Sequence, residues 1–272
     1  MLRVRDLCTW FPIHSGWRGR VTGHIKAVDE VSFHIPDGST VGLVGESGSG
    51  KSTIARTLLK LYSPGQALIR GEATFQGQEI LALKEDQFRP MRRDIQMVFQ
   101  DPFGSLNPRQ SVASILGEPL EIHCPALKSV DRRERSVGML KQVGLPPDAI
   151  DRFPHEFSGG QRQRIGIARA LAVQAKFLIL DEPVSALDVS VQAQIVNLLQ
   201  DLQDSLKLTY LFIGHDLAVI EHLCDHVLVM HRGKLVESGT KEQIYGDPQN
   251  DYTRTLLAAA SNGGMTAPIR ST

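Results

Sequence analysis

Residues 45–52 are Gly45-Glu46-Ser47-Gly48-Ser49-Gly50-Lys51-Ser52, which matches the pattern GxxxxGK[ST] at every fixed position. The pattern requires a strand before it and a helix after it. Residues 40–44 form a short apolar strand candidate, and residues 52–61 have apolar side chains at helical spacing. Glycines let such a loop curl, so that its backbone N–H groups face phosphate oxygens. The stretch therefore predicts a phosphate-binding loop between a strand and a helix.

The side chains of this loop suit a nucleoside triphosphate. We expect Lys51 to reach the β and γ phosphates and Ser52 to ligate Mg²⁺. A glycine- and serine-rich turn before a helix is the simple alternative, but the lysine and serine stand in register and the strand and helix are both present. The further residues expected to contact ATP are Gly45, Ser47, Gly48, Ser49, Gly50 and Thr53.

A second polar cluster follows the apolar residues 177–180, where the chain continues with Asp181 and Glu182. Such residues lie at the carboxyl edge of a parallel sheet, where ligands of α/β folds bind. We expect Asp181 to hold Mg²⁺ through water and Glu182 to act as the general base on the attacking water. Taken alone, two acidic residues after a strand are more often turn formers.

Length, charge and cysteine content exclude several classes of protein. The 272 residues suffice for one large domain, and 30 basic against 30 acidic residues do not indicate nucleic acid or an anionic membrane as the main partner. The three cysteines are far apart and form no CxxC pair, as expected for reduced thiols. No apolar run approaches the about 18 residues of a spanning helix, and the N-terminus does not resemble a signal peptide.

The remaining pattern predicts an α/β fold with a mainly parallel sheet, an N-terminal antiparallel β region and an inserted helical lobe. The antiparallel region is expected at residues 2–7 and 27–35, with a loop at 15–23 between them. The helical lobe covers about 110–172. The other expected strands are 72–75, 95–99, 177–180, 210–213 and 227–230, and the helices of the sheet are 191–206 and 217–223.

Ser158-Gly159-Gly160-Gln161, after Phe157 and before the helical run 162–172, resembles the signature motif of ABC ATPases. The order of motifs also follows that family: phosphate loop, Gln100, signature, Asp181-Glu182 and His215. The resemblance implies the ABC ATPase fold, a phosphate-loop NTPase core with a β subdomain and a helical subdomain. It implies one domain over 1–261, with the core at about 1–100 and 173–250, the helical signature subdomain at about 101–172, and a flexible tail at 262–272.

The resemblance also implies roles for single residues. Gln100 would sense Mg²⁺ and the lytic water, Asp188 would communicate across a dimer, and His215 would contact the γ-phosphate. The signature residues Ser158, Gly159, Gly160 and Gln161 would act on ATP held by a second chain, with the serine capping a helix whose positive end points at the phosphate. Phe11 is the candidate that stacks on adenine, Trp10 is its competitor, and a plain core aromatic is the alternative.

Three longer strings are similar to the dipeptide and oligopeptide importer ATPases: residues 99–109, 182–192 and 252–257. This resemblance implies a second ABC ATPase subunit, either a second copy or, as is common in this subfamily, a different ATPase in a heterodimer. It also implies two membrane-spanning permease subunits and an extracytoplasmic solute-binding protein. It implies a peripheral position at the cytoplasmic face of the bacterial inner membrane, with no nucleic-acid partner. Nickel import is the nearest alternative.

Other functions within the ABC family would require features that can be checked in the sequence. A soluble ABC ATPase acting on DNA or ribosomes would carry coiled-coil insertions, paired nucleotide domains or basic arms, and a module without turnover would be expected to lack Glu182 or His215. Departures from the family remain: Gly214 replaces a Ser or Thr, and Asn250-Asp251 replace His-Pro. No cysteine follows Cys224, so no iron–sulphur cluster is predicted.

Overall fold

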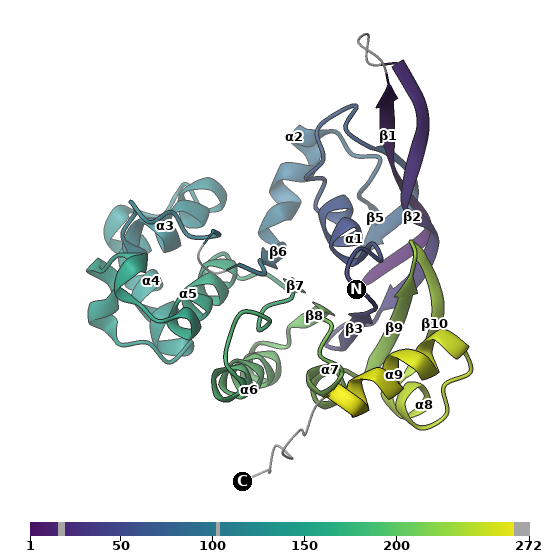
Figure 1. The fold of residues 1–272 in the computed structure, drawn as a ribbon. Coiled ribbons are helices and arrows are strands. Elements are labelled where there is room, and N and C mark those ends of the chain that lie inside the picture. Colours follow the sequence, from purple (N-terminus) through teal and green to yellow (C-terminus); the bar gives the residue numbers. More distant parts are fainter. Residues whose placement is uncertain (16–19, 102–103, 264–272) are drawn as a thin grey trace. The chain divides into compact units, whose positions relative to one another are not determined.

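A computed structural model describes residues 1–15, 20–101 and 104–263 (Figure 1). Of residues 261–263 only the backbone is described. The described residues form two compact units. The first contains Met1–Phe88 and the chain from Leu211 onward, and the second is Arg89–Tyr210. The predicted limits of the subdomains and of the tail stay predictions.

The first unit contains an antiparallel sheet with the strand order β2-β1-β4-β5. Leu2 and Val4 of β1 are buried, as apolar alternation predicts, and an irregularity in the register between Val4 and Leu7 lets Leu7 be buried as well. The predicted antiparallel region is therefore confirmed. The strands are β1 (Leu2–Ser15), β2 (Arg20–Ile35), β4 (Leu68–Phe75) and β5 (Gln78–Glu79).

The hairpin of β1 and β2 is longer than predicted, because pairing continues from Trp10↔Lys26 to Ser15↔Arg20. The expected loop at 15–23 was wrong at its C-terminal side, since β2 begins at Arg20. Backbone ladder bonds hold this outer part together although its side chains lack alternating burial. Apolar alternation therefore marked only the buried half of the hairpin.

The first unit also contains the strand that precedes the phosphate loop. This strand, β3 (Thr40–Val44), is buried at every residue and pairs in parallel with β9 (His226–His231), which pairs antiparallel with β10 (Lys234–Thr240). The prediction of β3 and of α7 (Leu217–Leu223) was confirmed at both ends. Five elements of this unit were not predicted: β5, α2 (Glu85–Phe88), β10, α8 (Lys241–Gly246) and α9 (Asp251–Gly263). The remaining helix described in this unit is α1 (Lys51–Leu58).

The second unit contains the parallel pair β6 (Ile95–Val98) and β7 (Phe177–Asp181), with Val98 opposite Leu180. This register brings the carboxyl ends of two distant segments to the same edge. Between them in sequence lie helices α3, α4 and α5, which pack against one another (Figure 1). The helices of the unit are α3 (Val112–His123), α4 (Ser129–Gln142), α5 (Gly159–Leu171) and α6 (Val189–Leu206), with 3-10 turns at Arg89–Arg93, Pro147–Asp151 and Pro154–Glu156.

Strand β8 (Thr209–Ile213) crosses the boundary between the two units. Its five residues are buried. The described chain thus has the predicted α/β architecture, with an antiparallel sheet near the N-terminus, parallel pairs of buried strands, and a helical stretch between β6 and β7.

Candidate functional site

The phosphate loop follows β3 and depends on two glycines that lie directly against neighbouring backbone. A Cβ at Gly45 would lie 2.1 Å from the Met230 carbonyl oxygen, and one at Gly50 would lie 2.2 Å from the Ala27 carbonyl oxygen. Both have positive φ, 144° and 108°. Gly48 also has positive φ, but a Cβ there would meet nothing within 4 Å. Sterics therefore require glycine at 45 and 50, while backbone conformation alone favours it at 48.

Lys51 is held inside the loop and is only 5% exposed. Its Nζ donates to the carbonyl oxygens of Gly45, at 2.7 Å, and of Glu46, at 2.9 Å. The Ser49 N–H also donates to the Glu46 oxygen, at 3.1 Å. These bonds fix a positive charge beside the curled backbone. Ser47 and Gly48 are exposed at the loop, whereas Ser52 and Thr53 are half-buried in the first turn of α1.

The loop fits a phosphate group by two further observations. Ser49 is 4% exposed, and its Oγ has no hydrogen-bond partner among the described residues. A buried hydroxyl without a partner is costly, so a ligand oxygen there would be stabilising. The first turn of α1 has no side-chain cap, because its N-cap residue is Gly50. Its N–H groups therefore suit an anion.

The second unit brings together two of the predicted catalytic residues. Val98 and Leu180 are paired in the parallel register. Gln100 and Glu182 each follow two residues later, so they lie at matching positions past the ends of the two strands. Gln100 Nε2 donates to Glu182 Oε2 at 2.9 Å. Asp181 ends β7 and is 4% exposed. An amide, a carboxylate and a buried aspartate thus lie at one edge of the β6/β7 pair, as the sequence predicts.

Glu182 is one of eight described non-glycine residues with a positive φ. Its φ of 48° lies in the left-handed region, which residues with a Cβ disfavour. Its carbonyl oxygen accepts from the Ser185 N–H, at 3.3 Å, and from the Ser185 Oγ, at 3.1 Å. These two bonds stabilise the turn that follows β7.

The signature residues form the predicted helix start. Ser158 is the N-cap of α5, where its Oγ accepts from the Gln161 N–H at 3.4 Å, and Gln161 Oε1 accepts from the Ser158 N–H at 3.0 Å. This is a capping box, which closes the first turn from both sides. The serine cap is therefore present, and Gln161 completes it.

The two signature glycines have a packing role that the sequence did not reveal. A Cβ at the buried Gly160 would lie 2.4 Å from Val191 Cγ1, and one at Gly159 would lie 3.3 Å from Leu187 Cδ2. The start of α5 therefore packs closely against the segment that begins α6. A Cβ at 160 would therefore overlap the Val191 side chain of the same chain unless that side chain shifted.

Asp188 caps α6. Its Oδ1 accepts from the Val191 N–H at 3.0 Å and from the Ser190 Oγ at 2.7 Å. The hydrogen bond from Ser190, followed by that from the Val191 backbone, lowers the pKa of the exposed Asp188 carboxyl. The role predicted for Asp188 across a dimer stays a prediction.

Gly214 and His215 follow β8. The Gly214 N–H donates to the Leu43 carbonyl oxygen at 3.2 Å, and a Cβ at Gly214 would lie 3.2 Å from Cε1 of Phe212. A serine here would require the phenylalanine ring to shift slightly, so glycine matches this packing. His215 is exposed.

The two adenine candidates differ in what covers their rings. Trp10 has Lys26 Nζ 4.5 Å and the Arg70 guanidinium 5.5 Å from its ring centroid. Phe11 is half-buried and makes an edge contact with Tyr62, with centroids 5.2 Å apart. Cations thus lie over the Trp10 ring, while Phe11 contacts another aromatic ring, and the choice of Phe11 for adenine stays a prediction.

The described part of the chain contains no group of three His, Cys, Asp or Glu side chains that could hold a metal ion. None of its helices is both long and apolar enough to cross a membrane. Cys8, Cys124 and Cys224 are free thiols. Pro102 and Phe103 of the predicted extended loop lie outside the described residues, and so does the predicted tail from residue 264.

Comparisons with known proteins agree with one another. Residues 28–185 match the family model described as ABC transporter. The oligopeptide transport ATP-binding protein AppF of Bacillus subtilis (strain 168) is 50% identical over 260 residues, which cover 95% of this chain and 78% of that protein. A putative peptide import ATP-binding protein of Brucella ovis is 53% identical over 259 residues, which cover 95% of this chain and 78% of that protein.

Solved structures show the same fold. A dimeric ATP-binding cassette in a post-hydrolysis state with ADP and Pi has a TM-score of 0.76 and 28% identity, and the match covers 89% of this chain and 99% of that one. The CbiO1 protein of Clostridium perfringens, part of a transporter complex, has a TM-score of 0.74 and 27% identity, and the match covers 90% of each chain. The predicted fold class is confirmed.

Proposed function

Because the chain belongs to the ABC transporter family and carries that family's ATP-hydrolysing domain, we propose that it drives a bacterial importer of di- or oligopeptides. The observation that carries the proposal is the extent of similarity to peptide transporters. Identities of 50% and 53% extend over 95% of the chain, well beyond the motifs that ATP chemistry needs. The strings at 99–109, 182–192 and 252–257 are the parts of the sequence that resemble peptide importer ATPases beyond the nucleotide motifs.

The phosphate loop is proposed to bind the triphosphate. Lys51 would bind the β and γ phosphates, and the Ser49 hydroxyl and the loop N–H groups would bind phosphate oxygens. Ser52 would ligate Mg²⁺, and the metal would offset the phosphate charge. Gln100 and, through water, Asp181 are the further residues that the family resemblance implies for Mg²⁺. The support is the buried lysine, the unpartnered Ser49 Oγ and the uncapped start of α1.

Glu182 is proposed to take the proton of the attacking water. The hydrogen bond from Gln100 orients its carboxylate, and His215 would orient the γ-phosphate. Phosphoryl transfer depends mainly on positioning and charge stabilisation. An oriented Glu182 carboxylate and bound phosphates would therefore meet its main requirements.

Two chains are proposed to complete each site. The Ser158–Gln161 segment of one chain would act on the ATP of the other, so that ATP closes the pair and hydrolysis opens it. A similar solved cassette is dimeric, which supports this arrangement. The partner is proposed to be a different ATPase, with two permease subunits and a solute-binding protein, at the cytoplasmic face of the inner membrane.

The test of hydrolysis uses two variants of the chain. Lys51→Ala should weaken ATP binding roughly 100-fold, because it removes charge-assisted hydrogen bonds to phosphate. Glu182→Gln should keep ATP affinity while steady-state hydrolysis falls by roughly 100-fold or more, because an amide cannot accept the proton. Nucleotide titrations and phosphate release measure both. Hydrolysis by Glu182→Gln at the unmodified rate would remove Glu182 as the base.

The solute requires a separate experiment. The assembled complex should be purified from its native membrane, and the co-purifying solute-binding protein should be analysed by mass spectrometry for its ligand. Bound di- or oligopeptide supports the proposal. A bound nickel complex contradicts it, and so does a purified complex that contains no solute-binding protein.

A further inference from the structure

We propose that Tyr252, at the start of α9, is a positioning residue for the phosphate loop. Its hydroxyl accepts a hydrogen bond from the peptide between Gly45 and Glu46. The carbonyl oxygen of the same peptide accepts a hydrogen bond from the Lys51 ammonium. This inference rests on the proposed function of the loop in ATP binding. It assigns a role to the C-terminal string 252–257, which hydrolysis chemistry alone does not require.

The peptide between Gly45 and Glu46 is bound on two sides. Its carbonyl oxygen, on Gly45, accepts from Lys51 Nζ at 2.7 Å. Its N–H, on Glu46, donates to the Tyr252 hydroxyl at 3.2 Å. In a trans peptide the carbonyl and the N–H point in opposite directions, so the lysine and the tyrosine hold opposite edges of one plane. Rotation of this peptide would break both hydrogen bonds.

The ring of Tyr252 is itself fixed beside the loop. It stacks on His231, with centroids 4.0 Å apart and ring planes 12° from parallel. His231 is the last residue of β9. The carbonyl group of Met230, just before it, lies directly against Gly45 of the loop. The next turn contributes a further contact, since the Gly233 N–H donates to the Ser49 carbonyl oxygen at 2.9 Å. One strand end therefore supports both the loop and the tyrosine.

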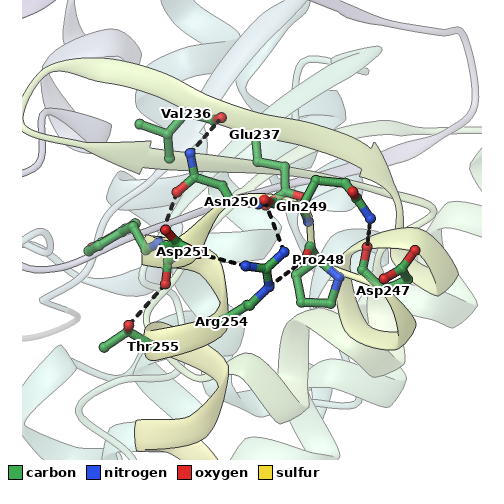
Figure 2. A network of polar contacts seen from close by, with 10 residues as sticks. Val236, Glu237, Asp247, Pro248, Gln249, Asn250, Asp251, Arg254 and Thr255 are labelled. Atoms are coloured by element: carbon green, nitrogen blue, oxygen red, sulfur yellow. Dashed lines mark hydrogen bonds and ion pairs between the residues drawn. The ribbon is translucent and has the colours of Figure 1, made fainter.

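Asn250 fixes the backbone just before the tyrosine (Figure 2). Its Oδ1 accepts from the Tyr252 N–H at 2.9 Å. Its own N–H donates to Glu237 Oε2 at 3.1 Å, and its Nδ2 donates to the Val236 carbonyl oxygen at 3.4 Å. The asparagine therefore caps the start of α9 and ties it to β10. This gives a structural reason for one of the two residues that replace the usual His-Pro.

Arg254 closes the same turn from the helix side. It donates to the carbonyl oxygens of Pro248, at 3.0 Å, and Gln249, at 3.2 Å, and pairs with Asp251 at 2.6 Å (Figure 2). The segment before α9 is thus held by side chains on both sides. The backbone that carries Tyr252 is therefore fixed by hydrogen bonds at the start of α9.

The test compares three variants of the full chain by calorimetric titration with MgATP. Tyr252→Phe keeps the ring and removes the hydroxyl, and it should raise the ATP dissociation constant about three- to tenfold, the usual effect of one hydrogen bond. The rise should appear in KM more than in kcat. Tyr245→Phe is the matched control, because its hydroxyl lies in the same unit but donates to the Leu217 carbonyl oxygen, at 2.6 Å, and not to the loop. It should leave ATP affinity unchanged.

Lys51→Ala separates this inference from the proposed function. Weak ATP binding by Lys51→Ala together with unchanged binding by Tyr252→Phe overturns the role of Tyr252 alone. Unchanged binding by Lys51→Ala overturns both. An equal loss in Tyr245→Phe also overturns the inference, because the effect would then be general. If Tyr252→Phe does not fold, Asn250→Ala provides the second measurement and should weaken ATP binding in the same direction.

Discussion

The phosphate loop and the signature segment both combine glycines with a helix start, but they are held in different ways. In the loop, Gly45 and Gly50 lie against backbone oxygens, and α1 has no side-chain cap. In the signature segment, Gly160 lies against a side chain, and the capping box satisfies the start of α5. Backbone cannot move aside, whereas a side chain can. The loop should therefore tolerate substitution less. The start of α1 also lacks a side-chain cap, which suits an anion, whereas the start of α5 is capped.

The largest effect is expected from Gly50→Ala. The new Cβ would lie 2.2 Å from the Ala27 carbonyl oxygen at a φ of 108°, so the free energy of unfolding should fall by about 3–5 kcal/mol. Urea denaturation measures the change. Gly48→Ala is the matched control, with positive φ but no atom within 4 Å, and it should cost only about 1–2 kcal/mol. Equal losses would show that backbone contact does not distinguish the two glycines.

A smaller effect is expected from Gly160→Ala. Its Cβ would lie 2.4 Å from Val191 Cγ1, and such overpacking costs about 1–3 kcal/mol. In a Val191→Ala background the same substitution should become neutral or stabilising, because alanine favours a helix by about 1 kcal/mol over glycine. A double-mutant cycle followed by urea denaturation measures the coupling. Additive effects would contradict the contact between these two residues.

The smallest effects are expected from the two helix caps, and pH separates them. Ser158→Ala should cost about 1 kcal/mol at any pH, since a hydroxyl does not titrate in this range. Asp188→Ala should be pH-dependent, because the Ser190 hydroxyl and the Val191 N–H lower the pKa of the Asp188 carboxyl on folding. That stabilisation is complete above the unfolded pKa of about 3.9 and is lost as the pH falls through the lower folded value.

Denaturation series from pH 7 down to pH 3 measure the cap effects. The difference between wild type and Asp188→Ala should shrink at the acid end, while that for Ser158→Ala should stay constant. A constant difference for Asp188→Ala would contradict the charged cap.

The fold was predictable where burial left a simple pattern. Strand β3 and helix α7 have buried apolar faces, and both were predicted to the residue. Strand β10 was missed, because none of its residues is fully buried and its sequence, KLVESGT, lacks a clear apolar alternation. Helix α9 was missed although part of it had been recognised as a family string. Recognition of a string does not reveal its conformation.

The site was predictable as a set of residues and less so as a set of contacts. The hydrogen bond between Gln100 and Glu182 joins positions 82 residues apart, and it depends on β6 lying beside β7 in register. No local pattern contains that pairing. The contact of Gly160 with Val191 is similar, because a glycine in sequence indicates missing bulk without identifying its neighbour. Tertiary adjacency decided both.

The left-handed backbone at Glu182 has a consequence for how the chain can vary. Glycine at this position would relieve roughly 1–2 kcal/mol of steric conflict, and asparagine would relieve part of it. Mutational drift toward a more stable molecule would therefore remove the carboxylate. Seven other described residues with a Cβ, among them Glu30 and Arg232, also have a positive φ, so this conformation alone does not indicate catalysis. At Glu182, stability and the proposed hydrolysis would instead favour different side chains.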